Sequence, residues 1–451
     1  MELNHFSVNS LKQKLLFGGF WALSLKFATG FLALLVNILL VRIMTMEDVG
    51  SYFITHSLVT ILSIVAQFGL PQLIVRLVSE NIAVNQVKEL KSNIYTIVII
   101  TLFSCFLVGI IVISFGGEWI AINVFNDPKL VGVLNLTAFW IVALSFQQII
   151  VETFRGLHDI KMASLFSGVI SNLIIVIILC IIFYSDKGNY YLVVQLVTFA
   201  AIISVLVSAY VLRRRLVVLK KVKFELNSAN IVRDAWPLWI TSISVFILTY
   251  SDLWVVTYFL NKTDVALYGS SAKLLIILSL VVSLSYAVLP PIIAEMNKKG
   301  EFEKLQNILR AFAFGNTLVV APIILIILLF PSYVLELFFG ESYIAAASVL
   351  IILSIGKLIN VVTGIRGYVL ILTGHGPILM KISLISGILN IVFCSLGATY
   401  WGVIGVSFGA MSAMIIQCLL EMIAVKHKLG IWTHLSFNEF KNLLYKLKHE
   451  K

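Results

Sequence analysis

The sequence contains little charge: only 12% of its 451 residues are Asp, Glu, Lys or Arg, whereas a soluble domain carries about 25%. Because 60% of the residues are hydrophobic, most of the surface must face something other than water. The net charge of +11 does not indicate nucleic-acid binding, since the basic residues are spread over short loops between apolar segments. The composition therefore excludes an ordinary soluble domain and predicts a membrane protein.

Cysteine and nucleotide-binding motifs are also scarce. The four cysteines lie inside apolar segments, at spacings that match no metal or redox motif: Cys105, Cys180, Cys394 and Cys418. No G-x-x-x-x-G-K-[ST] motif for a nucleotide phosphate is present, and the longest outer loop, about residues 115–130, is too short for a folded catalytic domain. These absences predict that the chain is not an enzyme, has no cofactor or metal, and does not drive transport by its own ATP hydrolysis.

The apolar segments are long enough to cross a bilayer, which takes about 20 residues. Backbone groups in lipid must pair within their own segment, so runs of this length predict helices. The predicted spans are residues 17–40, 50–75, 93–115, 131–151, 162–184, 190–211, 235–258, 267–290, 309–330, 344–365, 378–397 and 400–425. The predicted fold class is therefore all-α, a polytopic membrane protein with twelve transmembrane helices.

The longest polar interruption, residues 212–234, contains seven Lys or Arg residues. Such a basic cluster stays with the anionic cytoplasmic leaflet. When the N-terminus is also placed in the cytoplasm, 26 of the 33 Lys and Arg residues fall in inner segments and four in outer loops. This asymmetry predicts that both termini are cytoplasmic. It also predicts four parts: a bundle at 1–211, a linker at 212–234, a bundle at 235–425, and a tail at 426–451. In the tail, Ser436 to Glu439 have the spacing of a capping box, and a short amphipathic helix is predicted to follow.

The two halves of the chain resemble each other at a constant offset of 216 residues. The corresponding polar and apolar pairs are Asp48 and Asp264, Val49 and Val265, and Tyr52 and Tyr268. Each predicted half has six spans, so both halves face the same way. This predicts two six-helix bundles around a central cavity, an arrangement suited to alternating access.

Ionisable residues inside membrane spans are costly and mark candidate functional sites. Lys26 lies near the middle of the first span and Lys357 in the inner half of the tenth, and we expect both to face the cavity. Asp252 and Lys273 lie at similar depths in the seventh and eighth spans, where they could form a pair. The excess of Lys over acid predicts an anionic substrate, such as a phosphate or diphosphate headgroup. The candidate substrate-binding cations are these lysines and two arginines at span ends: Lys26, Lys273, Lys357, Arg42 and Arg366.

Several motifs resemble a known family. Residues 42–52, RIMTMEDVGSY, followed by Phe68-Gly69-Leu70-Pro71, resemble the opening hairpin of the Wzx-type polysaccharide flippases. These belong to the multidrug/oligosaccharidyl-lipid/polysaccharide exporter (MOP) superfamily. Asp252, followed by Val265-Ala266-Leu267-Tyr268, resembles the seventh and eighth helices of that family, and the resemblance covers nearly the whole chain.

The resemblance implies a flippase in the bacterial cytoplasmic (inner) membrane. It would move undecaprenyl-diphosphate-linked oligosaccharides from the cytoplasmic to the periplasmic leaflet for assembly of lipopolysaccharide O-antigen or capsule. The cavity cations would bind the diphosphate, and Asp252 would couple transport to an ion gradient. Besides the lipid bilayer, a polysaccharide polymerase and chain-length proteins would be its partners.

Three alternatives stay open. The first two are a cation-coupled multidrug antiporter and a lipid II flippase, both of the same superfamily. The third is a membrane-embedded polysaccharide polymerase or ligase. The excess of buried Lys over acid counts against the antiporter, and the lack of a large outer loop counts against the polymerase or ligase.

Overall fold

The computed structural model describes residues 8–84, 86–185, 188–217 and 228–441, and within these ranges it is helical with no strand. The all-α fold class predicted from the apolar segments is therefore confirmed. The chain divides into two compact units, Met1–Phe246 and Ile247–Lys451. The boundary between the units lies inside α11 (Ser228–Phe259), later in the chain than the basic segment 212–234.

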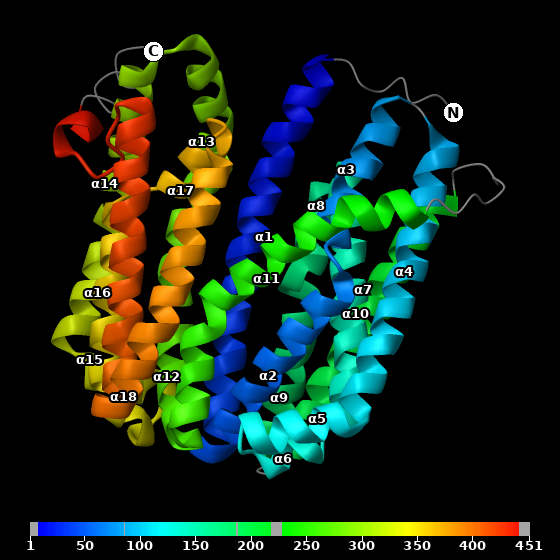
Figure 1. The fold of residues 1–451 in the computed structure, drawn as a ribbon, viewed down its shortest axis with the longest axis vertical. Helices are drawn as coiled ribbons and strands as arrows, with labels where there is room; N and C mark the ends of the chain where they lie inside the picture. The colour runs from blue at the N-terminus through cyan, green and yellow to red at the C-terminus, as the bar shows by residue number, and fades with distance from the viewer. Residues whose placement is uncertain (1–7, 85, 186–187, 218–227, 442–451) are drawn as a thin grey trace. The chain divides into compact units, whose positions relative to one another are not determined.

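Unit 1 contains seven helices of 14 residues or more, besides the first part of α11, and they are joined by short helical connections (Figure 1). The long helices are α1 (Val8–Ile43), α2 (Met46–Gln67), α3 (Leu70–Ala83), α4 (Val87–Ile113), α7 (Leu134–Gly156), α9 (Ile170–Ser185) and α10 (Tyr190–Val217). The short ones are α5 (Phe115–Trp119), α6 (Pro128–Val131) and α8 (Ile160–Ser164), with π-helical turns at Ile120–Val124 and Leu165–Val169.

Unit 2 contains the rest of α11 and seven further helices. These are α12 (Lys262–Leu274), α13 (Ile276–Lys299), α14 (Phe302–Leu329), α15 (Pro331–Phe339), α16 (Ala347–Val362), α17 (Arg366–Leu372) and α18 (Gly376–Leu429). A 3-10 turn at Glu341–Ala346 precedes α16.

Equivalent helix starts in the two units are capped in the same way. In unit 1 the Thr45 side chain accepts a hydrogen bond from the Asp48 amide at the start of α2 (3.3 Å). In unit 2 the Asn261 side chain accepts one from the Asp264 amide at the start of α12 (2.9 Å). Thr45 and Asn261 are 216 positions apart in the chain, and so are Asp48 and Asp264. The sequence repeat therefore corresponds to a repeat of local structure.

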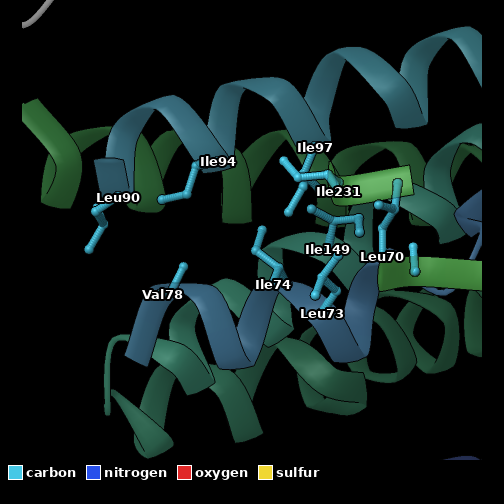
Figure 2. Packing of buried hydrophobic residues seen from close by; sticks show 10 residues of the cluster. Leu70, Leu73, Ile74, Val78, Leu90, Ile94, Ile97, Ile149 and Ile231 are labelled. Atoms are coloured by element: carbon cyan, nitrogen blue, oxygen red, sulfur yellow. The ribbon is translucent and has the colours of Figure 1, made fainter. Parts of the chain in front are cut away.

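A core cluster of unit 1 explains why the first part of α11 belongs there (Figure 2). Apolar side chains of α3, α4 and α7 pack together with Ile231 and Ala235 of α11. Gly69, which precedes α3, has a φ of +73°, and a Cβ at this position would lie 2.4 Å from the Ala235 carbonyl oxygen. Only glycine fits this backbone conformation and this close approach.

α18 has 54 residues, far more than the roughly 20 needed to cross a bilayer, and it is a helical hairpin. Its backbone is non-helical at Gly402 (φ 58°, ψ −142°). The orange and red halves of α18 then run side by side in Figure 1. Their backbones are so close that a Cβ on Gly405 would lie 2.1 Å from the Gly397 carbonyl oxygen. Paired glycines allow this close backbone contact, as at many helix interfaces in membranes.

The number of predicted spans is not confirmed. Ten helices in the described ranges are long and apolar enough to cross a membrane, or eleven when α11, bent by 54° between its segments Ile231–Ile247 and Thr249–Phe259, is counted as one more. The hairpin in α18 accounts for part of this difference, since the sequence analysis divided it into two spans. A polytopic membrane protein is confirmed, whereas the number twelve stays a prediction.

The start of the predicted amphipathic tail is present. The Glu439 amide donates to the Ser436 hydroxyl (3.5 Å), which is one of the two hydrogen bonds of a capping box. The rest of the predicted tail helix, residues 442–451, lies outside the described residues, as do residues 218–227 of the basic segment.

Candidate functional site

The candidate cation of unit 1 is Lys26, in the middle of α1. Its side chain is exposed, and no hydrogen bond or ion pair joins it to the residues that the structure describes. The charged neighbour that acts on it electrostatically is Arg155 of α7. Arg42 is also exposed and lies in the last turn of α1, where the helix dipole favours a cation.

Arg155 is neutralised within its own helix. Its guanidinium donates to both carboxylate oxygens of Glu152, at 2.7 and 2.8 Å, and the Gln148 amide donates to the same carboxylate at 3.2 Å. Glu152 is therefore neutralised by Arg155 and not by Lys26. Lys26 has no counter-ion among the described residues.

The candidate acid of unit 2, Asp252, is held by α12. The Tyr268 hydroxyl donates to one carboxylate oxygen (2.6 Å), and the Leu253 amide donates to the other (2.8 Å). Lys357 of α16 acts on the same carboxylate through its charge. The sequence repeat included Tyr268 as the counterpart of Tyr52, but it did not indicate that Tyr268 is the partner of Asp252.

The possible pair of Asp252 with Lys273 is not formed in the structure. No hydrogen bond or ion pair links these two residues, although the structure describes both. Lys273 follows Tyr268 by five positions on α12, which turns its side chain about 140° away around the helix axis. The face of α12 that meets Asp252 is therefore the face of Tyr268.

Two further contacts bring α18 to the same part of unit 2. The Asn390 amide donates to the Ser251 hydroxyl (2.9 Å), one residue before Asp252. The Cys394 thiol contacts the Asn390 side-chain oxygen (3.4 Å) and the Val406 carbonyl (3.5 Å). These contacts from α11, α12 and α18 hold the region of Asp252, and no spacing in the sequence indicated them.

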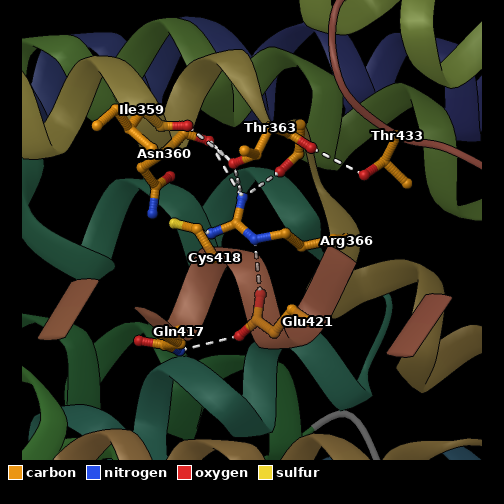
Figure 3. Close-up of polar contacts among 9 residues, drawn as sticks. Ile359, Asn360, Thr363, Arg366, Gln417, Cys418, Glu421 and Thr433 are labelled. Atoms are coloured by element: carbon orange, nitrogen blue, oxygen red, sulfur yellow. Dashed lines mark hydrogen bonds and ion pairs between the residues drawn. The ribbon is translucent and has the colours of Figure 1, made fainter. Parts of the chain in front are cut away.

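Arg366 differs from the other candidate cations because it is part of the interior of unit 2 (Figure 3). Its side chain and that of Glu421 are only 5% and 6% exposed and form an ion pair at 3.0 Å. The guanidinium also donates to the Asn360 carbonyl (3.2 Å), the Thr363 hydroxyl (2.6 Å) and the Gly364 carbonyl (2.8 Å). With these partners Arg366 joins the α16–α17 connection to α18, and its expected contact with substrate stays a prediction.

Comparisons with known proteins identify the family. A family model described as "Polysaccharide biosynthesis protein" matches residues 15–297, which is more than half of the chain. The chain belongs to this family. A second model, MatE, matches residues 237–396. The resemblance to the MOP superfamily is thereby confirmed.

Two curated relatives are similar to this member of the family. An uncharacterized membrane protein of Methanocaldococcus jannaschii, MJ1068, is 23% identical over 426 residues, which cover 92% of this chain and 84% of that protein. The probable low-salt glycan biosynthesis flippase Agl15 of Haloferax volcanii is 21% identical over 203 residues, which cover 45% of this chain and 43% of that protein.

Solved structures share the fold of this polysaccharide biosynthesis protein. An inward-facing multidrug resistance MATE family transporter of the MOP superfamily has a TM-score of 0.73 at 14% identity, covering 91% of this chain and 98% of the other. The lipid II flippase MurJ in an inward closed conformation has a TM-score of 0.70 at 18% identity, covering 94% and 90%. At these identities the likeness shows the fold alone.

Proposed function

We propose that the chain is a flippase that moves lipid-diphosphate-linked oligosaccharides across the membrane for surface polysaccharide assembly. The observation that carries this proposal is the match to the polysaccharide biosynthesis family over residues 15–297. The partial similarity to a probable glycan biosynthesis flippase supports the same class of cargo. In a bacterial inner membrane, the carrier lipid would be undecaprenyl diphosphate.

The proposed headgroup ligands are three lysines of the membrane helices. Lys26 in unit 1 and Lys273 in unit 2 have no hydrogen bond or ion pair to the described residues, whereas the charge of Lys357 acts on Asp252. An ammonium without a partner in a membrane helix is costly unless an anion or water reaches it, so a diphosphate would stabilise it. Arg42, at the end of α1, is proposed as a further ligand of the headgroup.

Asp252 is proposed to couple transport to an ion gradient. It is a carboxylate within a membrane helix whose neighbours are a hydroxyl, a backbone amide and the charge of Lys357. A change in its charge would alter the hold of α12 on α11, because the bond from Tyr268 depends on that carboxylate. We further propose both termini in the cytoplasm, and a polysaccharide polymerase and chain-length proteins as partners.

A second candidate function is cation-coupled drug export, which the MatE match over residues 237–396 favours. A cationic drug would need carboxylates that are free to receive it. Glu152 and Glu421 are instead paired with arginines, which leaves Asp252 as the acid of the proposed site.

Purified protein in liposomes tests the two functions side by side. One set of vesicles contains a polyprenyl-diphosphate oligosaccharide with a fluorescent sugar, a second contains fluorescent lipid II, and a third is loaded with a cationic dye. We expect the first probe to reach the opposite leaflet, as measured by its quenching with a membrane-impermeant reductant. Dye export without movement of either lipid would overturn the proposal, and movement of lipid II alone would assign the chain to that cargo instead.

A further inference from the structure

After α18 the chain turns back and packs along the end of unit 2. Residues 430–441 form this segment, which we call the C-terminal strap. Two of its backbone amides bind α14: Trp432 donates to the Gln306 side chain (2.8 Å) and Ser436 to the Arg310 carbonyl (3.4 Å). The Leu435 amide donates to the carbonyl of Val362, the last residue of α16 (2.9 Å). The strap therefore joins two helices that are distant from it in the sequence.

The strap also holds the short connection between α16 and α17. The Thr433 hydroxyl, which is buried, donates to the Thr363 carbonyl (2.9 Å). Gly364 has a φ of +78°, and a Cβ there would lie 2.6 Å from the Thr433 carbonyl oxygen. Beyond this point, the rings of Phe437 and Phe440 pack on Phe314 of α14, with centroids 5.4 and 4.9 Å apart.

The same connection is bound by Arg366 from the other direction. Figure 3 shows Thr363 between the Thr433 hydroxyl and the Arg366 guanidinium, which reaches the Thr363 hydroxyl and the Gly364 carbonyl. Release of the strap would therefore remove the bond from Thr433 and leave the Arg366–Glu421 network as the other side-chain contact described for this connection.

His434 lies in the strap next to positive charge. Its ring stands edge-on to Trp432 (5.4 Å between centroids), and the Lys426 ammonium lies 5.3 Å from the centre of the same Trp432 ring. From α14, the Arg310 guanidinium faces it, while Arg366 is committed to Glu421. The His434 Nδ1 and Arg310 Nε atoms are buried and have no hydrogen-bond partner among the described residues. Among the described residues, no carboxylate forms an ion pair or hydrogen bond with His434.

We propose that the C-terminal strap is a pH-sensitive clasp, which holds the α16–α17 connection against α14 and opens when His434 is protonated. Burial, and to a smaller extent the Arg310 charge, lower the pKa of His434 below its ordinary value of 6.5. The open strap therefore binds the proton more tightly than the closed one. The stability of the closed clasp is complete above pH 6.5 and declines as the pH falls from there toward the lowered pKa.

Hydrogen exchange of the full-length protein in lipid nanodiscs at pH 7.5 and pH 5.5 tests the clasp. After correction for the intrinsic pH dependence of exchange, we expect the Leu435 and Ser436 amides to lose protection at the lower pH. Because pH 5.5 lies one unit below the ordinary value of 6.5, the loss can reach at most about tenfold. His434→Asn should remove the loss, whereas His427→Asn, on an exposed residue of α18, should keep it.

Two further variants keep the test decisive if His434→Asn alters folding. Thr433→Val should weaken protection of both amides at both pH values, because it removes the bond to Thr363. Arg310→Gln should shrink the acid effect, because it removes the repelling charge. Equal corrected protection at the two pH values, or an undiminished acid effect in His434→Asn, would overturn the proposal. None of these measurements depends on what the protein transports.

Discussion

At the scale of single residues, the ion pair of Arg366 and Glu421 should be the charge contact on which stability depends most. Both side chains are almost fully buried, so removing one leaves the other charge without compensation. We predict that Glu421→Leu lowers the free energy of unfolding by about 3–5 kcal/mol, measured by denaturant titration in detergent.

The control for this prediction is Glu80→Leu, which removes an exposed partner of Arg76 at 3.6 Å and should change stability by at most about 1 kcal/mol. The double variant Arg366→Met with Glu421→Leu should recover much of the loss, because no unpaired charge remains. Equal losses for Glu421→Leu and Glu80→Leu would contradict a structural role for this pair.

Lys26 is the residue on which the proposed headgroup site depends in unit 1. We predict that Lys26→Ala lowers the initial rate of lipid-linked oligosaccharide flipping by about tenfold or more, the effect of one lost hydrogen bond to a charged group. Expression and thermal stability should be unchanged, because the ammonium has no intramolecular bond to lose among the described residues. Lys298→Ala, on an exposed lysine near the end of α13, is the matched control. Wild-type flipping by Lys26→Ala would remove Lys26 from the site.

The Asp252–Tyr268 contact should act as a unit in transport. Since Tyr268 donates to the Asp252 carboxylate, Asp252→Asn and Tyr268→Phe should show a coupling energy of about 0.5–3 kcal/mol in a double-mutant cycle on flipping rate. Asp252→Asn combined with Lys273→Ala should be additive, because no contact joins them. If the coupling appears with Lys273 and not with Tyr268, the face of α12 assigned to Asp252 is incorrect.

At the scale of elements, the hairpin of α18 depends on glycine at the contact of its two halves. Gly405→Ala would place a Cβ 2.1 Å from the Gly397 carbonyl oxygen, so we predict a loss of about 1–3 kcal/mol in unfolding free energy. Gly109→Ala in α4 is the control, because a Cβ there meets nothing within 4 Å and helix propensity alone favours alanine by about 1 kcal/mol. Comparable destabilisation by both substitutions would refute the importance of the close contact.

Sequence patterns predicted the positions of the helices better than the bends and connections between them. Apolar runs predict where the membrane helices lie, because a helix needs about 20 apolar residues to cross a bilayer. They also separate 378–397 from 400–425, close to the turn at Gly402, but they do not reveal that α11 bends and is shared by both units. Those features depend on close backbone approaches, such as Gly69 against Ala235, which involve residues far apart in the sequence.

The candidate site was predictable in its charges but not in its partners. The cost of an ionisable group in a span pointed to Lys26, Asp252 and Lys357 without any structure. Depth along a helix does not show which face a side chain occupies. Lys273 was therefore a possible partner of Asp252, although Tyr268 is the residue that donates to the Asp252 carboxylate. For the same reason Arg366 was expected to be available to substrate, although Glu421, 55 positions later, neutralises it.

At the scale of the whole molecule, the distribution of basic residues makes a prediction about orientation. The ends of α10, α13 and α18 carry clusters of Lys or Arg that should remain in the cytoplasm: Arg214 and Arg215, Lys298 and Lys299, and Lys426 and Lys428. The helical connection after α4 is predicted to lie on the opposite side. In unit 1, Arg213 and Glu118 are exposed residues of these two regions, so each can report the side on which it lies.

Single cysteines at these positions test the orientation in intact cells, in a variant whose four native cysteines are replaced by alanine. We predict that Glu118→Cys reacts with a membrane-impermeant maleimide from outside, whereas Arg213→Cys and His427→Cys react only after the membrane is permeabilised. A basic cluster stays in the cytoplasm for two reasons. Segments rich in Lys and Arg are translocated poorly, and the anionic inner leaflet attracts them by about 1 kcal/mol per residue. Labelling of Arg213→Cys in intact cells would contradict the cytoplasmic location predicted for the end of α10.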